Sequence, residues 1–276
     1  MSTASAVFWT AAALVLAGCG GGAAANGLDD PPATPDTPTQ APPRLLLTFD
    51  DNPPGAVRKP VLANKGTATA VVDLVSVGTR TVSFAADGAD GSALVLPSYT
   101  GQRSGPFAAV RVVADGNDWL SPGESGFSFG ADVMLNPRSM GTEVDNGDNV
   151  VQRGLFEDSA QYKIQVDKRH PSCVVRGSAG ALVAKSKTVL GDGWYRVRCD
   201  RTGPDAITLT VTDLGAGGEP RVTSAEGPIG DVEMAGDAPL SVGAKVSANG
   251  DLTVSSTDQF NGEIDNVYYD SGSGPA

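Results

Sequence analysis

The chain has 276 residues, which is enough for one large domain or two small ones, and its 32 acidic against 20 basic residues give a net charge of −12. This charge repels phosphate backbones and anionic headgroups, so it argues against nucleic acid as a partner and against docking of a folded domain on anionic lipid. Glycine (35) and proline (19) are frequent, and no stretch repeats apolar residues at helical spacing. We therefore expect many short strands joined by turns.

Residues 1–18 form an apolar segment that ends in small residues, as a secretory signal peptide does. The sequence Leu16-Ala17-Gly18-Cys19 resembles a bacterial lipobox. In lipoproteins with this motif the peptide is cut before the cysteine, whose thiol carries diacylglycerol, so the resemblance implies lipidation at Cys19. No Lys or Arg precedes the apolar run, which leaves an uncleaved N-terminal anchor as the alternative. Both readings place the remainder outside the cytoplasm, on the outer face of a cell membrane to which only the N-terminus attaches.

Residues 19–43 are rich in Pro, Gly, Thr and Ala and show no hydrophobic periodicity. Such a segment cannot bury enough surface to fold, so we expect a disordered tether. The sequence shows no internal repeat and no second linker, which predicts one domain over residues 44–270 and a disordered tail over residues 271–276.

Within that domain, apolar and polar residues alternate repeatedly, as in strands with one buried face. Residues 127–135, 161–166 and 206–213 show the pattern most clearly, and their apolar residues are predicted to face the core. Turn pairs such as Asp115-Gly116 and Asn249-Gly250 separate the strands. The further strands that we expect are residues 45–50, 80–85, 93–97, 108–113, 194–199, 240–246 and 260–270. About a dozen short strands without a helix predict an all-β fold, a two-sheet antiparallel jelly-roll sandwich.

Four segments resemble the laminin-G-like, concanavalin-A-like jelly-roll domains of secreted bacterial proteins, most of all the actinobacterial ones. They are LLLTFD (45–50), DWLSPGESGFSFGADVML (118–135), DGWYRVRCDRTGPDAITLTVTD (192–213) and the pair PLSVGAKV and FNGEIDNVYY near the C-terminus. The region from Lys65 to Val77 fits less well and is interpreted as an insertion. The resemblance implies the fold; its members include lectins, adhesion domains and glycoside hydrolases, so function must be argued from the site.

Cysteines indicate one disulfide. If Cys19 carries lipid, Cys173 and Cys199 remain, and in an oxidising compartment two such residues form a pair. Each shares a strand face with apolar residues, so both are predicted to point inward.

Glu263 and Asp265 lie two positions apart on the last predicted strand and raise the question of catalysis. Retaining glycosidases of this fold carry three acidic residues at alternate positions of a strand, because the chemistry needs a nucleophile and an acid about 5 Å apart. Here the third position falls on Val267 or Tyr268, and neither can act as a carboxylic acid. His170, the one histidine, lies in a polar segment that we interpret as a solvated turn. We therefore expect a protein that is not an enzyme.

Asp265 has a second interpretation. Ile264 and Val267 both resemble core residues, yet their spacing of three breaks strand alternation, which predicts a β-bulge at Asp265 or Asn266. In related jelly rolls the aspartate at this position ligates a structural calcium ion, and Asp50 of the opening strand would then lie beside it. The alternative is that Asp265 accepts backbone hydrogen bonds at the bulge and binds no metal.

Sugar-binding modules present exposed aromatic rings for stacking on pyranose faces. Trp119 and Tyr99 lie in predicted turns, and Tyr268 faces outward if Tyr269 faces inward, so these three are the candidate ligand-binding residues. Trp194 begins a strand and is predicted to lie in or near the core. We expect a monomeric, non-catalytic recognition or adhesion module for an extracellular glycan or protein. The alternative is a carbohydrate-active enzyme, a glycoside hydrolase or lyase, on the same fold.

Overall fold

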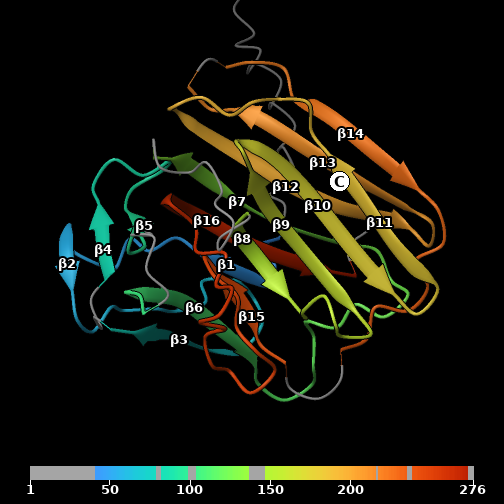
Figure 1. The fold of residues 1–276 in the computed structure, drawn as a ribbon, viewed down its shortest axis with the longest axis horizontal. Coiled ribbons are helices and arrows are strands. Elements are labelled where there is room, and N and C mark those ends of the chain that lie inside the picture. Colours follow the sequence, from blue (N-terminus) through green and yellow to red (C-terminus); the bar gives the residue numbers. More distant parts are fainter. Residues whose placement is uncertain are drawn as a thin grey trace, which may run out of the picture. The chain divides into compact units, whose positions relative to one another are not determined.

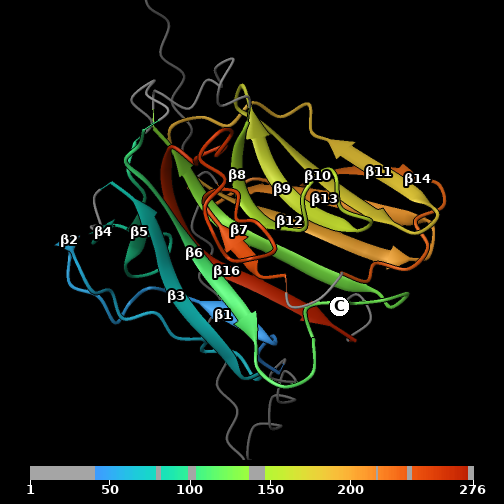
Figure 2. The same cartoon turned by 60° about the horizontal axis from the view of Figure 1, so that its bottom comes forward.

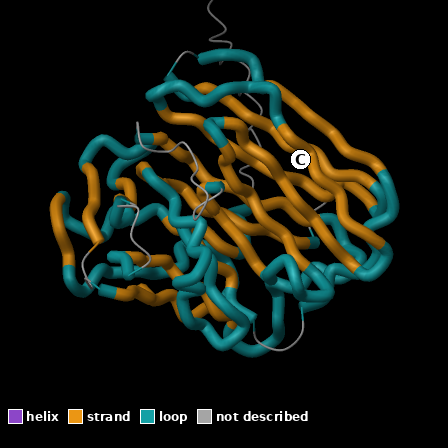
Figure 3. The backbone as a smooth tube through the Cα atoms, viewed as in Figure 1, coloured by secondary structure: helices purple, strands orange, loops and turns teal. Residues whose placement is uncertain are grey.

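The structure is a computed structural model that describes residues 41–78, 82–98, 104–136, 147–215, 217–234 and 238–272. The chain divides into two units, Met1–Gln40 and Ala41–Ala276, and every described residue lies in the second. Cys19, the predicted signal peptide, most of the predicted tether, Tyr99 and residues 273–276 lie outside the described ranges. Among the described residues there are strands and loops but no helix (Figure 3). No segment in these ranges is therefore a helix long and apolar enough to cross a membrane.

The described residues form sixteen strands, and their arrangement is shown in Figures 1 and 2. In chain order they are β1 (Leu45–Leu47), β2 (Gly55–Val57), β3 (Ala70–Val77), β4 (Val82–Ala85), β5 (Ala93–Val95), β6 (Phe107–Ala114), β7 (Phe127–Leu135), β8 (Asp148–Arg153), β9 (Gln161–Asp167), β10 (His170–Gly177), β11 (Gly180–Lys185), β12 (Trp194–Gly203), β13 (Ala206–Asp213), β14 (Arg221–Glu226), β15 (Leu240–Val242) and β16 (Gly262–Ser271).

These strands make two antiparallel sheets. The larger has the order β14-β13-β12-β7-β16-β5-β4-β2, with β1 also pairing with β16, and the smaller has the order β11-β10-β9-β8-β15-β6-β3. Neighbours that are distant in sequence are common: β16, the last strand, pairs with β1, β5 and β7. The two sheets pack face to face, and their inward-facing side chains form one continuous core.

The alternation seen in the sequence decides which side chains enter this core. In β7 the predicted inward residues are all at most 3% exposed, and Tyr162, Ile164 and Val166 of the opposing sheet are at most 1% exposed. Ring centroids of Phe129 and Tyr162 lie 5.0 Å apart across the core, and those of Tyr162 and Tyr269 lie 5.7 Å apart. These aromatic contacts stabilise the fold beyond the burial of apolar area, and they join the two sheets at their centre.

The predicted bulge in β16 is present. Its pairing with β7 shifts register between Asp265 and Tyr268, and Asn266 takes a left-handed backbone conformation with φ of 47°. One extra residue in β16 restores the alternation, so that Ile264 and Val267 are both fully buried.

The region from Lys65 to Val77, which was interpreted as an insertion, contains β3, which pairs with β6 over its whole length and forms one edge of the smaller sheet. The expectation that His170 is a turn residue is wrong: it begins β10, and the turn lies at Lys168 and Arg169, where φ is 50° and 67°.

Candidate recognition face

The central strands of the larger sheet carry charged and aromatic side chains on the face that points away from the core. Pairing of β7 with β12 and β16 places Asp132 between Arg196 and Asp265, and places Gly130 between Arg198 and Tyr268. We call this surface the outer face and define it by Trp194, Arg196, Arg198 and Tyr268, together with the carboxylates that hold the arginines.

Arg196 and Asp132 form a bidentate pair on the outer face. Nε and Nη2 of Arg196 donate to the two carboxylate oxygens of Asp132, each at 2.8 Å, and Nδ2 of Asn266 donates to the second oxygen at 3.0 Å. These hydrogen bonds raise the pKa of Arg196. Asp132 is 1% exposed whereas the Arg196 side chain is 52% exposed, so a buried carboxylate fixes the direction of a guanidinium that solvent reaches.

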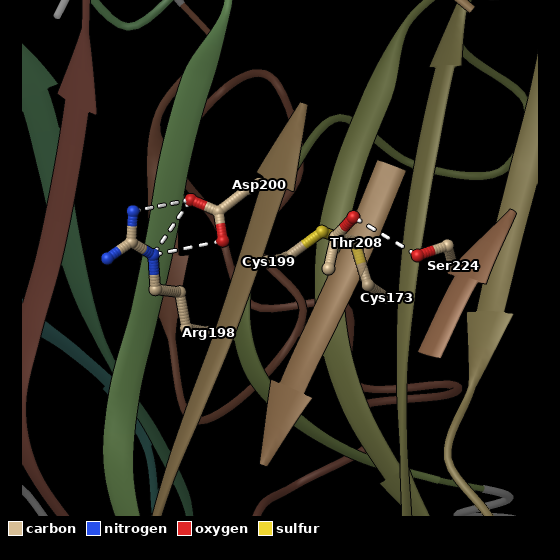
Figure 4. The surroundings of a disulfide bond; sticks show 6 residues. All are labelled: Cys173, Arg198, Cys199, Asp200, Thr208 and Ser224. Atoms are coloured by element: carbon tan, nitrogen blue, oxygen red, sulfur yellow. Dashed lines mark hydrogen bonds and ion pairs between the residues drawn. A yellow bond between two sulfur atoms is a disulfide. The ribbon is translucent and has the colours of Figure 1, made fainter. Parts of the chain in front are cut away.

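Arg198 is held in the same manner from its own strand. Its Nε donates to both oxygens of Asp200, at 2.7 and 3.0 Å, and its side chain is 36% exposed (Figure 4). Thr208 and Ser224, whose hydroxyls lie 3.3 Å apart, continue the polar surface onto β13 and β14. The outer face therefore presents two oriented guanidinium groups in adjacent rows of the sheet.

Tyr268 lies over β7, where a glycine leaves room for its ring. A Cβ at Gly130 would come within 2.8 Å of the Tyr268 ring and 3.0 Å of its hydroxyl. Burial raises the pKa of Tyr268, so the phenol stays neutral. Its hydroxyl oxygen is buried, so the outer face presents only part of the ring. The prediction that Tyr268 faces outward while Tyr269 faces inward is confirmed, because Tyr269 is fully buried and Tyr268 is not.

Trp194 lies one row further along the outer face. It is partly exposed, and its indole Nε1 donates to the main-chain carbonyl of Asp87 at 3.0 Å. The loop between β4 and β5 thus reaches across to β12. Trp194 was expected in or near the core. It pairs with Met134 on the face opposite the buried Val197 and Cys199, so it lies outside the core and is half-buried.

The same loop covers Asp265, which is fully buried. One of its oxygens accepts from the amide of Asp90 at 3.1 Å, and the other accepts from the amide of Asn266 at 2.7 Å. Burial raises the pKa of Asp265 to about 7, the two amides oppose this shift, and the negative charges of Asp132 and Asp50 add to it. Among the described residues no cation forms an ion pair with Asp265.

Asp50 approaches the loop from the opening strand's end. Its Oδ1 accepts from the amide of Ser92 at 2.8 Å, and it packs against Gly91, where a Cβ would collide with the carboxylate. Two carboxylates beside this loop supply the oxygen donors that calcium prefers. In the described part of the chain no three Asp, Glu, His or Cys side chains converge as a metal site, so main-chain oxygens or water would have to complete the coordination. The donor chemistry fits calcium with Asp265 and Asp50 as ligands.

Glu263 and Asp265 do not form an exposed catalytic pair. Burial, and to a lesser extent the negative charge of Asp87, raises the pKa of Glu263, as a general acid would require. Asp265, however, is fully buried and both its oxygens accept protein hydrogen bonds. A substrate cannot reach it in this conformation.

The three predicted aromatic ligands do not form a platform in the described structure. Trp119 is 8% exposed, its ring lies 6.0 Å from that of Tyr269, and its Nε1 donates to the carbonyl of Thr69 at 3.0 Å. The prediction that Trp119 is exposed for ligand binding is therefore wrong: it belongs to the core. Tyr99 lies outside the described residues, and Tyr268 alone of the three is placed on the outer face.

The predicted disulfide is present beneath the outer face. Cys173 of β10 and Cys199 of β12 are bonded, with their Cα atoms 6.0 Å apart, and both are fully buried. Figure 4 shows Cys199 between Arg198 and Asp200 in the chain, with its sulfur directed toward Cys173. Because β10 and β12 belong to different sheets, the bond crosses the core instead of joining neighbouring strands.

Sequence reasoning missed Trp194, Arg196 and Arg198 as surface residues. The signal was available, since residues 194–200 alternate and Val197 and Cys199 face the core. The residues between them, together with Trp194, must then face outward.

No model of a known protein family matches the sequence, and no curated protein matches it. Solved structures do match in fold. The binding domain of botulinum neurotoxin DC, solved in complex with SialylT, has a TM-score of 0.52 and 10% identity over 84% of this chain and 48% of that chain. The binding domain of Paraclostridial mosquitocidal protein 1 has a TM-score of 0.52 and 13% identity over 83% and 49%.

The full-length tailspike protein 2 of the Escherichia coli O157:H7 bacteriophage CAB120 has a TM-score of 0.50 and 11% identity over 76% of this chain and 27% of that chain. The domain is a two-sheet antiparallel jelly roll. The resemblance to concanavalin-A-like, laminin-G-like domains is thereby confirmed at the level of the fold. The jelly roll spans about half or less of the chains that it matches, and identities this low carry only the fold.

Proposed function

We propose that the protein is a non-catalytic recognition module that binds an extracellular glycan or protein through the outer face. The observation that carries this proposal is the pair of guanidinium groups, Arg196 and Arg198, each held by a carboxylate of its own sheet and each partly exposed. Donors fixed before binding lose little conformational entropy when a ligand arrives. Tyr268 and Trp194 add aromatic ring surface, which suits sugar rings and peptide side chains alike.

The similar structures support this proposal only through the class of protein to which they belong. Two of them are binding domains, and one of these was solved with SialylT bound. The alternative is a carbohydrate-active enzyme, and Glu263, whose pKa is raised by burial, is the residue that would favour it. Burial of Asp265 weighs against that alternative, because a glycosidase needs two accessible carboxyl groups.

We expect the full chain, extracted in detergent, to bind a subset of the glycans or surface proteins on an array. Arg198→Ala and Arg196→Ala should each weaken that binding about tenfold or more, because each variant loses a charged hydrogen bond to the ligand. Arg58→Ala, which removes an exposed arginine far along the chain from β12, is the matched control. Binding that both outer-face variants retain would contradict the proposal. Release of reducing sugar from a bound glycan, abolished in Glu263→Gln, would establish the enzyme instead.

We further propose that the module is tethered to the outer face of a membrane by lipid on Cys19. The supporting feature is the sequence Leu-Ala-Gly-Cys after an apolar run. We expect the wild type to partition into detergent and Cys19→Ser either to appear in the aqueous phase or to keep residues 1–18. Identical partitioning and identical mass of the two mature proteins would contradict lipidation.

We also propose that Asp265 and Asp50 hold a structural calcium ion. The ion would supply positive charge beside a buried carboxylate that has no cationic partner among the described residues. Its role would be to fix the loop between β4 and β5 against β16, next to Trp194 and the outer face.

A further inference from the structure

The two sheets end side by side at one edge of the jelly roll. β11 is the last strand of the smaller sheet and β14 is the last strand of the larger sheet (Figures 1 and 2). Each pairs with only one neighbour, so both present an unpaired strand edge. Natural proteins protect such edges, because an extended segment of another chain can pair with them.

Between these edges lies a groove of about 620 Å³, which we call the edge groove. Residues 185–189 form one wall and residues 221–223 form the other. Val189 and Val222, at 57% and 61% exposed, place apolar side chains at the groove. An unpaired strand edge with exposed apolar side chains is a surface on which another extended chain can pair.

The edge groove is cationic although the protein is acidic. Lys185, Lys187 and Arg221 line it, in a chain with 32 acidic and 20 basic residues. Lys185 contacts Asp167 at 3.5 Å, whereas Lys187 and Arg221 form no ion pair within the described ranges. Two uncompensated cations in a groove attract an anionic ligand.

The main chain of the wall alternates as an edge strand does. The amides of Ser186 and Leu190 donate to the carbonyls of Pro171 and Arg169, each at 2.9 Å, and the amide of Thr188 donates to the Ser186 hydroxyl at 3.0 Å. In the described structure the amides of Lys187 and Val189 donate to no protein atom. Donors at alternate residues are the pattern that accepts an added strand.

We propose that the edge groove binds an acidic peptide segment in extended conformation, which adds as a strand along Lys187 to Val189. The main chain of the peptide pairs with the two unpaired amides. Its acidic side chains meet Lys187 and Arg221, and its alternate side chains contact Val189 and Val222. A peptide fits better than a polysaccharide because the wall offers main-chain donors with the two-residue repeat of a strand. This site is separate from the outer face and does not depend on the function proposed for it.

The test uses the full chain in detergent and a fluorescein-labelled decapeptide of alternating Glu and Thr, with binding measured by fluorescence anisotropy. We expect saturable binding that weakens with salt. Lys187→Glu and Arg221→Glu should each weaken it at least tenfold. Val189→Pro, which removes one unpaired amide without breaking an internal hydrogen bond, should do the same. Lys59→Glu changes net charge equally at an exposed lysine outside the groove and should leave binding unchanged.

A second peptide, N-methylated at every residue, separates strand addition from charge alone. It keeps every carboxylate but can pair on neither of its edges, so we expect at least a tenfold loss. Equal binding of the two peptides would overturn the proposal, as would full binding by Lys187→Glu or by Arg221→Glu. Binding of a galacturonic acid oligomer where the Glu-Thr peptide does not bind would also overturn it and assign the groove to an anionic glycan. Near-ultraviolet circular dichroism confirms that each variant is folded, so that a loss of binding is not a loss of structure.

Discussion

Replacing both Cys173 and Cys199 by alanine is expected to lower the free energy of unfolding by about 3 kcal/mol, the value for a closed loop of this size. The two residues are 26 apart in sequence, and their bond crosses from β10 to β12 through the core. In the unfolded chain the bond holds together segments that would otherwise separate, and its loss also leaves space between the sheets. Urea denaturation of the wild type and of the double variant measures the difference.

Two observations accompany this measurement. Thiol titration of the denatured, unreduced wild type should find neither cysteine free. The matched control is Ser172→Ala, a substitution at the buried neighbour of Cys173 that leaves the bond intact. If the double variant and the wild type unfold at the same urea concentration, the bond does not constrain the unfolded chain as proposed.

Calcium is expected to raise the melting temperature of the wild type at pH 8 and to leave Asp265→Asn unchanged. At one hundred times its dissociation constant a ligand of the folded state stabilises by about 2.7 kcal/mol. Glu263→Gln removes a nearby carboxylate of the same strand and should keep the full response. The melting curves are recorded with calcium and with EDTA. If wild type and Asp265→Asn respond equally to calcium, Asp265 is not a calcium ligand. If neither responds, Asp265 only accepts hydrogen bonds from backbone amides. In that case Asp265→Asn should still cost about 1 kcal/mol, the value of one hydrogen bond.

The metal-free protein offers a second readout at the same residue, through pH. The folded-state pKa of Asp265 is raised to about 7, mainly by burial, above the unfolded value of about 3.9. The folded state therefore binds the proton more tightly, so this contribution to stability is complete below pH 4 and is lost as pH rises through 7. In EDTA, the wild type should lose stability relative to Asp265→Asn between pH 5 and pH 8. A difference that does not change with pH would show that Asp265 titrates normally in the folded protein.

How much the sequence predicts depends on whether the apolar residues of a strand alternate. β7, β9 and β13 were predicted because apolar residues occupy every second position and face the core. The edge strands β3, β11 and β14 were not, because exposed valines at positions such as Val71, Val183 and Val222 break the alternation. The interior strand β8 was not predicted either, because both of its faces are buried and its sequence does not alternate. The bulge in β16 was predicted from the spacing of Ile264 and Val267, since the core cannot accept both without an extra residue.

At the candidate site, the local sequence did not predict the position of a side chain that is fixed by contacts with residues distant in the chain. Trp119 follows turn residues, and nothing near it indicates that its ring packs on Tyr269 and donates to Thr69, 50 positions away. Trp194 was expected in or near the core, although its position in an alternating strand places it on the outward face. The loop that covers Asp265 could not be predicted either, because Asp90 and Asp265 are 175 residues apart in the sequence.

The position of β16 has a consequence for how the protein is made. This strand spans Gly262–Ser271 and pairs with β1, β5 and β7, so the larger sheet lacks a central member until almost the whole chain is available. During synthesis the earlier strands have unpaired edges until β16 is made, which is a condition that favours aggregation and makes folding slow. A nascent chain arrested before residue 262 would leave β1 without its partner and β7 paired on one side only. The jelly roll therefore completes its larger sheet only after translation has passed its last strand.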